Sequence, residues 1–452
     1  MRSPNIKFGL IKNDKKKIFI FGLVLTQNVL LTNYSTLLIL NVVQYLKKKK
    51  MPKILITGNG FDLSLGLPTS YSDFIKILSS LNNNIQCNFN SIYNNCYNYE
   101  LITKKYKIFD FDYAKIEALR TSILNNLWFN FFKNELEIET WIDFENKIEY
   151  VLNNLFTSVE YMKKNIFSKG SIPEDKINYE PVLFNNNVEI IQVLNSFNII
   201  TINESYNITL NVNYLIKKYD FFIDVNINKI TQKLIEELKE FKKIFNLYFE
   251  VFIYPFYENQ KIKLDTTLFS TITKHYTFNY TPTFEKVYKT SYKTSFLHGK
   301  IDSNLNQIVL GINEIPNEEL DKRYFLPFTK YYQKLNNNTD FEFLSDFDKK
   351  KNSNFQFFFF GHSLDTSDKD YINEVFDFVN SLKSKTKTII VIYHNKESKS
   401  ALLINLLSIR GKKDIQTLMR NKNLIFLNIE SNKLKSILKK NINNRPTKSK
   451  LI

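Results

Sequence analysis

The side chains best suited to proton transfer are histidines, and His298, His362 and His394 each follow directly on a short apolar segment that we expect to be a strand. Asn279 follows a similar segment. An imidazole titrates near neutral pH and can take a proton from a hydroxyl group or a water molecule, while an amide can hold that group in place. These strand ends therefore predict a site for acid–base chemistry; the alternative is that each histidine is a hydrogen-bonded structural residue. His275 precedes the end of its strand, and we expect it to affect stability more than activity.

A glycine loop follows the first predicted strand. Residues 54–56 form a short apolar run, Gly58, Asn59 and Gly60 come next, and Thr69 or Ser70 opens the helix that we expect after the loop. A strand, a glycine loop and a helix in this order make a phosphate cradle, because loop amides and a helix N-terminus both favour an anion. The same order also makes a purely structural turn, and the third glycine of G-x-G-x-x-G is missing.

Asp62 stands beside this loop. A carboxylate repels a phosphate, so its ordinary role would be a cap or a hydrogen bond within the loop. Because Gly60 would let the backbone approach a diphosphate, we expect Gly60→Val to block ligand binding and to leave the fold intact.

The histidines could also ligate a metal ion, since imidazole is a common ligand. No H-x-x-x-H or paired-carboxylate spacing accompanies them, so we expect a site without metal. Cys87 and Cys96 are the only cysteines and do not form C-x-x-C, which excludes a four-cysteine zinc module and fits a reducing compartment such as the cytoplasm.

The chain has 452 residues, 43% of them hydrophobic and 24% charged, which is typical of a globular protein of two or three domains. Its formal net charge is +17, and a basic surface could bind nucleic acid. Apart from residues 47–50 and the C-terminal tail, however, the lysines are scattered, and frequent Lys, Asn, Ile, Phe and Tyr indicate A/T-rich codons. We therefore do not expect nucleic acid as the main partner.

Residues 1–50 differ from the rest of the chain. A charge-free stretch at 18–46 is bounded by lysines on both sides and is long enough for a membrane span. Polar residues interrupt it, and no small-residue cleavage site follows, which disfavours a signal peptide. The alternatives are a mis-called start, with Met51 as the true first residue, and a membrane anchor at 18–46; we favour the first.

In the C-terminal part, apolar strands alternate with helical patterns. Strands are predicted at 355–360, 388–393 and 424–429, with helices at 368–382 and 398–407 between them. This alternation predicts an α/β fold with a Rossmann-like, doubly wound parallel sheet. Ligands of such sheets bind beyond the carboxyl ends of the strands, where the polar residues gather.

The predicted organisation is a first βα unit at 51–84, a large, mainly helical insertion at 85–264 and the remainder of the sheet domain at 265–452, which ends in a basic tail. The insertion contains a long amphipathic helix over 228–252. It also contains Glu145 and a second glutamate one turn later, which could form an acid pair at a cleft. We favour the ordinary interpretation, a solvated helix face.

Six short motifs stand in a characteristic order along the chain. They are Gly-Asn-Gly-Phe-Asp at 58–62, Leu-Pro-Thr at 67–69, Trp-x-Asp-x-Glu at 141–145, Phe-Asn-Tyr-Thr-x-Thr at 278–283, Leu-His-Gly at 297–299 and Gly-His-Ser-Leu-Asp at 361–365. The set resembles the AbiH family of bacteriophage abortive infection proteins, from Met51 to about Ile429. The resemblance implies a bacterial protein of antiviral defence, with a phage trigger that the motifs do not identify.

The order of the motifs is also remotely similar to sirtuin-like NAD-binding domains. That similarity implies that Asn279 lies by the nicotinamide ribose and that His298, 298 − 279 = 19 residues later, is the catalytic base. The residues implied to bind the dinucleotide lie in the glycine loop and at two later strand ends: Gly58, Asn59, Gly60, Asp62, Gly361, His362, Ser363 and Asn395. The loop does not read Gly-Ala-Gly-x-Ser, and the zinc module of the deacylases is missing, so the activity that the similarity implies is NAD hydrolysis.

Three hypotheses for function follow. The first is an NAD glycohydrolase that infection releases, the second a nucleotide-binding sensor without turnover, and the third a basic effector that acts on nucleic acid. The first predicts that His298→Ala and Asn279→Ala each abolish defence and NAD loss while the melting temperature changes little. The sequence leaves open whether the chain forms a homo-oligomer.

Overall fold

The computed structural model describes residues 9–13, 16–20, 51–81, 87–135, 141–174, 187–202, 208–262, 265–288, 294–301, 308–315, 322–337, 343–350, 353–384 and 386–439. The chain divides into two compact units, residues 1–51 and 52–452. In the first unit, strand β1 (Gly9–Asn13) pairs antiparallel with β2 (Lys16–Ile20). The rest of the charge-free stretch considered as a membrane anchor, from residue 21 on, lies outside the described residues. Among the helices that are described, none has the length and apolar character needed to cross a membrane.

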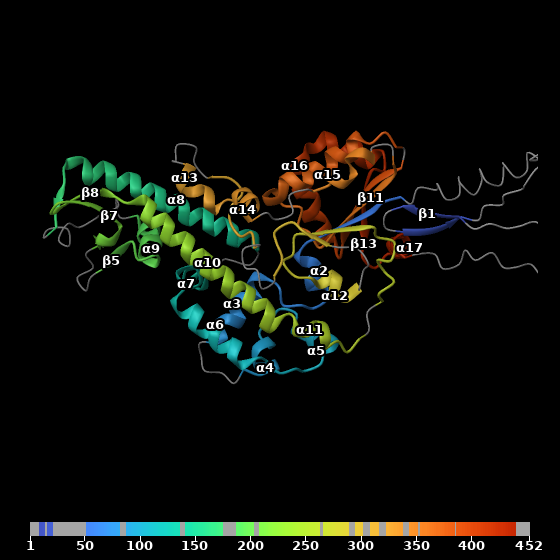
Figure 1. The fold of residues 1–452 in the computed structure, drawn as a ribbon, viewed down its shortest axis with the longest axis horizontal. Coiled ribbons are helices and arrows are strands. Elements are labelled where there is room, and N and C mark those ends of the chain that lie inside the picture. The colour runs from blue at the N-terminus through green and yellow to red at the C-terminus, as the bar shows by residue number, and fades with distance from the viewer. Residues whose placement is uncertain are drawn as a thin grey trace, which may run out of the picture. The chain divides into compact units, whose positions relative to one another are not determined.

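The second unit is an α/β structure built on a six-stranded sheet in which all pairings are parallel (Figure 1). Its strands are β3 (Lys53–Thr57), β9 (Lys274–Thr277), β10 (Thr294–Phe296), β11 (Phe355–Phe360), β12 (Lys387–Tyr393) and β13 (Leu424–Asn428). The strands predicted at 355–360, 388–393 and 424–429 are thus confirmed to within a residue. Both faces of the central strands are covered, which explains why β11 reads as a nearly continuous run of phenylalanine.

The order of strands across the sheet is β10-β9-β3-β11-β12-β13. The first strand of the sheet in chain order, β3, therefore lies in the middle, with the next two strands on one side and the last three on the other. The winding direction reverses between β3 and β11. Beyond the carboxyl ends of two strands at such a reversal, the loops diverge and leave a crevice.

Two hydrophobic cores lie on opposite faces of the sheet, because successive side chains of a strand point to opposite sides. Leu55 belongs to the first core, whereas its neighbours Ile54 and Ile56 belong to the second. The second core packs under α15 (Lys369–Ser381) and α16 (Lys396–Arg420), which cover one face of the sheet in Figure 1. The helices predicted at 368–382 and 398–407 correspond to these two, and α16 runs farther because it continues past a kink at Gly411.

The first core contains residues of α2 (Asn59–Ser64), α3 (Tyr71–Leu81) and α12 (Thr283–Tyr288), together with much of the segment between α3 and β9. That segment is mainly helical: α4 (Phe89–Tyr93), α5 (Tyr99–Lys105), α6 (Tyr113–Asn125), α7 (Leu127–Asn134), α8 (Trp141–Asn165), α9 (Val188–Ser196), α10 (Ile227–Phe252) and α11 (Pro255–Glu258). The amphipathic helix predicted at 228–252 is confirmed as α10.

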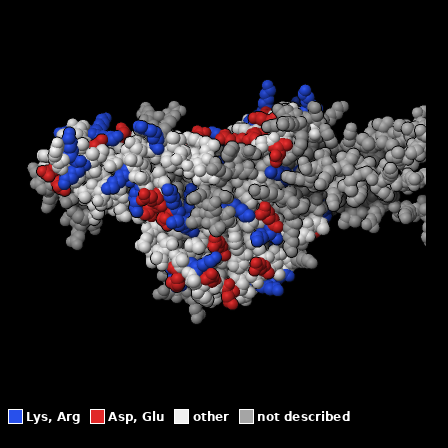
Figure 2. Space-filling view, viewed as in Figure 1, with Lys and Arg blue, Asp and Glu red and all other residues white. Residues whose placement is uncertain are grey.

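Short strands lie at the far end of the long helices α8 and α10 (Figure 1). They are β4 (Ile172–Pro173), β5 (Ile200–Ile202), β6 (Ile208–Leu210), β7 (Leu215–Lys218) and β8 (Phe221–Val225). Between β10 and β11 the chain forms α13 (Lys322–Phe325) and α14 (Lys330–Asn337), and α17 (Asn432–Leu438) follows β13. On the face shown in Figure 2, basic and acidic side chains of the described residues are interspersed.

Candidate functional site

A cavity of about 880 Å³ lies at the carboxyl ends of the central strands, where the winding of the sheet reverses. Its lining includes every residue that the sequence analysis placed in a site: Gly58, Asn59, Gly60, Asp62, Asn279, His298, Gly361, His362, Ser363 and Asn395. His275 is not among the lining residues. Gly58 and Asn395, which are 395 − 58 = 337 residues apart in the chain, thus meet at one cavity.

The glycines of this cavity pack two strand-end loops against each other. The N–H of Gly60 donates to the carbonyl of Gly361 (2.8 Å), and that of Gly58 donates to the carbonyl of Phe360 (3.2 Å). A Cβ atom on Gly60 would lie 2.8 Å from the Cα of Gly361, and one on Gly361 would lie 2.1 Å from the backbone nitrogen of Phe61. The expectation that Gly60→Val leaves the fold intact is therefore wrong. The amides of Gly58 and Gly60, which a phosphate cradle would need free, already donate to the β11 loop.

The helix after the glycine loop also begins earlier than predicted. Helix α2 starts at Asn59, directly after Gly58, and the predicted start at Thr69 or Ser70 lies at the entrance to the next helix, α3. The side chain of Asn59 forms two hydrogen bonds with Thr69. Nδ2 of Asn59 donates to the backbone oxygen of Thr69 (3.0 Å), and the Thr69 hydroxyl donates to Oδ1 of Asn59 (2.7 Å). Asn59 thus fastens the loop to the segment ahead of α3.

Asp62 lies on the cavity wall and is only 1% exposed. The hydroxyl of Thr281 donates to its Oδ2, while its Oδ1 is buried without a hydrogen-bond partner. Burial raises the pKa of the Asp62 carboxyl to about 7, against the opposing effect of the Thr281 hydrogen bond and of the nearby polar groups of Thr283 and Asn279. The group can therefore hold or release a proton near neutral pH, and in its neutral form it does not repel an anion.

Asn279 and His298 follow the ends of neighbouring strands. Asn279 comes after β9, and its backbone N–H donates to Thr277 Oγ1 (3.0 Å), which fixes the turn beyond the strand. His298 comes after β10 and is 5% exposed, with its ring against the edge of Phe278. Burial lowers the pKa of His298 to about 4, although Asp368 opposes this shift. At neutral pH its imidazole is neutral and can act as a proton acceptor.

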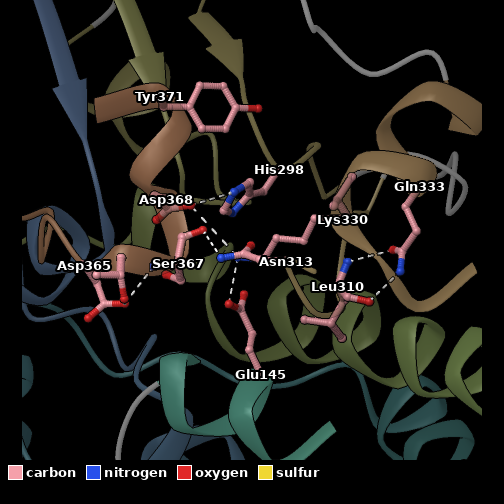
Figure 3. A network of polar contacts seen from close by, with 12 residues as sticks. Glu145, His298, Leu310, Asn313, Lys330, Gln333, Asp365, Ser367, Asp368 and Tyr371 are labelled. Carbon is pink, nitrogen blue, oxygen red and sulfur yellow. Dashed lines mark hydrogen bonds and ion pairs between the residues drawn. The ribbon is translucent and has the colours of Figure 1, made fainter. Parts of the chain in front are cut away.

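Two histidines face one carboxylate in this cavity (Figure 3 shows His298 and Asp368). Nε2 of His298 lies 3.3 Å from Oδ1 of Asp368, and Nε2 of His362 lies 3.4 Å from Oδ2. Neither nitrogen reaches good hydrogen-bond geometry with the carboxylate, so both contacts are close approaches between polar groups. Nδ1 of His362 accepts the backbone N–H of Leu364 (2.8 Å), so its ring proton is on Nε2.

A buried ion pair adjoins the carboxylate. The ammonium group of Lys330, at the start of α14, lies 2.7 Å from Glu145 Oε2 on α8 and 3.9 Å from Asp368 Oδ1. Burial raises the pKa of Asp368, but Lys330 and the two imidazoles outweigh it and hold that pKa well below its usual value. Burial likewise raises the pKa of Glu145 to about 7, against Lys330. The favoured interpretation of Glu145 as part of a solvated face was therefore wrong.

The remaining histidines and Asn395 have other surroundings. His275 is 1% exposed and lies between two hydroxyls, with Nε2 3.0 Å from Thr57 Oγ1 and Nδ1 3.0 Å from Thr294 Oγ1. His394 is exposed at the cavity rim. Oδ1 of Asn395 accepts the N–H of Ser398 (2.7 Å) and caps α16, so this oxygen is engaged within the chain.

The sequence analysis missed two residues of this cluster, Lys330 and Asp368. Asp368 follows the Gly-His-Ser-Leu-Asp motif at the entrance to α15, and an acidic residue at a helix start after a strand end was a signal that could have found it. Nothing in the pattern around Lys330 distinguishes it from the other lysines. Within the described part of the chain, no three His, Cys, Asp or Glu side chains are arranged to hold a metal ion.

Comparison with known proteins gives one match. The family model described as Bacteriophage abortive infection AbiH matches residues 54–393, about three quarters of the 452 residues. No curated protein and no solved structure matches the chain. The matched range begins in β3 and ends in β12, so it contains both strand-end loops and the Asp368 cluster.

Proposed function

The chain belongs to the AbiH family of bacteriophage abortive infection proteins, and from this premise we propose that it defends a bacterial cell by cleaving NAD in the strand-end cavity. The observation that carries the proposal is the meeting of Asn279 and His298 with the loops of β3 and β11 around one cavity. The proposed products are nicotinamide and ADP-ribose.

The architecture supports a dinucleotide as the ligand. Numbered in chain order, the strands of the sheet run 3-2-1-4-5-6, which is the order of Rossmann dinucleotide-binding folds. Those folds bind their ligand at the carboxyl ends of the strands where the winding reverses, which is the position of this cavity. Its volume of about 880 Å³ falls within the range of roughly 300–1,000 Å³ typical of ligand pockets.

The charges in the cavity favour one orientation of NAD. The Asp368 carboxylate, which Lys330 and the two imidazoles keep ionised, lies 3.3 Å from His298 and favours the cationic nicotinamide end and the positive charge that develops on the ribose. The N-terminus of α16 follows the carboxyl end of β12. Its cap residue Asn395 and Ser398 line the cavity there. A helix N-terminus favours an anion, so the diphosphate would lie on that side.

The reaction asks for few groups. When the C1′–N bond breaks, nicotinamide leaves with the bonding electrons and the ribose acquires oxocarbenium character. Water then forms the new C1′–O bond and gives up a proton, which neutral His298 accepts and later releases to solvent. The Asn279 amide would hold the water or a ribose hydroxyl, and the neutral form of Asp62 lets the ligand approach the β3 loop without repulsion.

The proposal is tested in phage-challenged cells by following survival and cellular NAD. We expect wild type to lower NAD after infection and His298→Ala and Asn279→Ala to lose both NAD depletion and protection at unchanged protein level. Asn154→Ala, which removes an amide bonded to Tyr150 on α8 away from the cavity lining, is the matched control and should protect like wild type. Protection by wild type without NAD loss would contradict the enzyme and favour the non-catalytic sensor.

A further inference from the structure

We propose that Asp368 is the positioning residue of this site: its carboxylate, 3.3 Å from Nε2 of His298, favours the ring proton on that nitrogen and thereby leaves Nδ1 as the atom that takes up the proton. Its catalytic consequence rests on the proposed function, whereas the tautomer that it imposes is a property of the protein alone. The sequence motifs give Asp368 no role.

The first step of the argument is the geometry around the carboxylate. Its two oxygens face two different imidazoles, Oδ1 at 3.3 Å from His298 Nε2 and Oδ2 at 3.4 Å from His362 Nε2. The Asp368 side chain is only 12% exposed, so water competes little for these oxygens. An ionised carboxylate only accepts hydrogen bonds, so each facing nitrogen is best placed when it carries the ring proton.

The second step concerns His362, which fixes the position of the carboxylate. The backbone N–H of Leu364 occupies its Nδ1 at 2.8 Å, in a turn where Leu364 has a left-handed φ of 55°. The ring proton of His362 is therefore on Nε2, the nitrogen that lies 3.4 Å from Oδ2 of Asp368. His362, which follows β11, thus contacts Oδ2 of the carboxylate, and the other oxygen, Oδ1, faces His298.

The third step concerns the free nitrogen of His298. A neutral imidazole has one ring proton, and with that proton on Nε2 the lone pair is on Nδ1. Among the described residues, none forms a hydrogen bond with Nδ1 of His298, and the residue lines the cavity. After Nδ1 takes up a proton from water, the imidazolium lies against the Asp368 carboxylate and is stabilised by it.

The remaining charged groups around Asp368 affect how readily His298 becomes charged. Lys330 lies 3.9 Å from Oδ1 and disfavours a charged His298, as does the more distant Lys334. Glu145 lies 2.7 Å from Lys330 and offsets part of that charge. Removing the Asp368 charge leaves Lys330 paired with Glu145, so we expect Asp368→Asn to fold.

The experiment uses histidine nitrogen NMR on the full chain, which has only four histidines to assign. In wild type at neutral pH, we expect both His298 and His362 to carry the proton on Nε2. In Asp368→Asn, an amide N–H can turn toward His298 and drive the proton to Nδ1. Asp368→Glu should keep the wild-type tautomer, and Asp370→Asn, an exposed change on the same helix, should leave all four signals in place.

Turnover of NAD is measured on the same variants. We expect Asp368→Asn to lower kcat on the order of 10²–10⁴-fold with little change in KM, Asp368→Glu to recover part of it, and Asp370→Asn to match wild type. A His298 proton on Nδ1 in wild type, or a tautomer indifferent to Asp368→Asn, overturns the positioning role. If the tautomers are those expected but the wild-type protein does not cleave NAD, only the proposed function is contradicted. A lower melting temperature with unchanged kcat per folded molecule would assign Asp368 a structural role.

Discussion

Replacement of Gly361 by alanine should separate the two strand-end loops. The new Cβ would lie 2.1 Å from the backbone nitrogen of Phe61, while ordinary contact begins at 3.4 Å, so the backbones must move apart by about 1 Å. That movement breaks two hydrogen bonds, those from Gly58 and Gly60 to the β11 loop, worth about 0.5–1.5 kcal/mol each. The φ of +67° adds about 1–3 kcal/mol of strain for a residue with a side chain.

The expected loss in the free energy of unfolding is therefore about 2–6 kcal/mol, a large part of the stability of an ordinary protein. Urea unfolding measures it, with Gly411→Ala as the matched control. Gly411 also has a positive φ, of +74°, but a Cβ there meets nothing within 4 Å, so only the backbone strain applies. Equal losses in the free energy of unfolding for the two variants would refute the packing of the loops. A larger loss for Gly361→Ala than for Gly411→Ala would support it.

Three further predictions concern buried ionisable groups. Burial lowers the pKa of His275 to about 3, against 6.5 in the unfolded chain. Between these two pH values the unfolded chain binds more protons than the folded chain, so the wild-type protein should lose stability as the pH falls from 6.5 to about 3. Urea unfolding at stepped pH should show a shallower loss for His275→Asn. Lys242, whose pKa burial lowers to about 7 from 10.5, should make stability rise between pH 7 and 10.5, and Lys242→Met should remove that rise. A double-mutant cycle of Glu145→Gln and Lys330→Met should give a coupling free energy in the range of about 0.5–3 kcal/mol, and additive effects would contradict the ion pair.

The sheet was predictable because its strands are short apolar runs bounded by polar residues. Strands β11 and β12 are covered on both faces, so their sequences lack the alternation that would confuse them with surface strands. The long helix α10 was predictable for the complementary reason, since its buried residues recur at helical spacing. Both signals are local and depend little on distant parts of the chain.

The site was predictable only in part. Polar residues after parallel strands meet at one edge of the sheet whatever else the chain does, and this brought Asn279, His298 and His362 together. The partner of the Gly58–Gly60 loop is a backbone about three hundred residues away, and no local pattern shows which amides that backbone occupies. The pairing of Glu145 with Lys330 depends likewise on how two distant helices pack, so a residue that resembles a solvated glutamate is buried.

The most direct test of the account is the fate of NAD with the full chain purified from phage-infected cells. We predict release of nicotinamide and ADP-ribose in equal amounts, with turnover abolished in His298→Ala and Asn279→Ala purified in the same way and shown to be folded. NAD recovered intact with folded wild-type protein would contradict the proposed cleavage, and unchanged turnover in both variants would contradict the site.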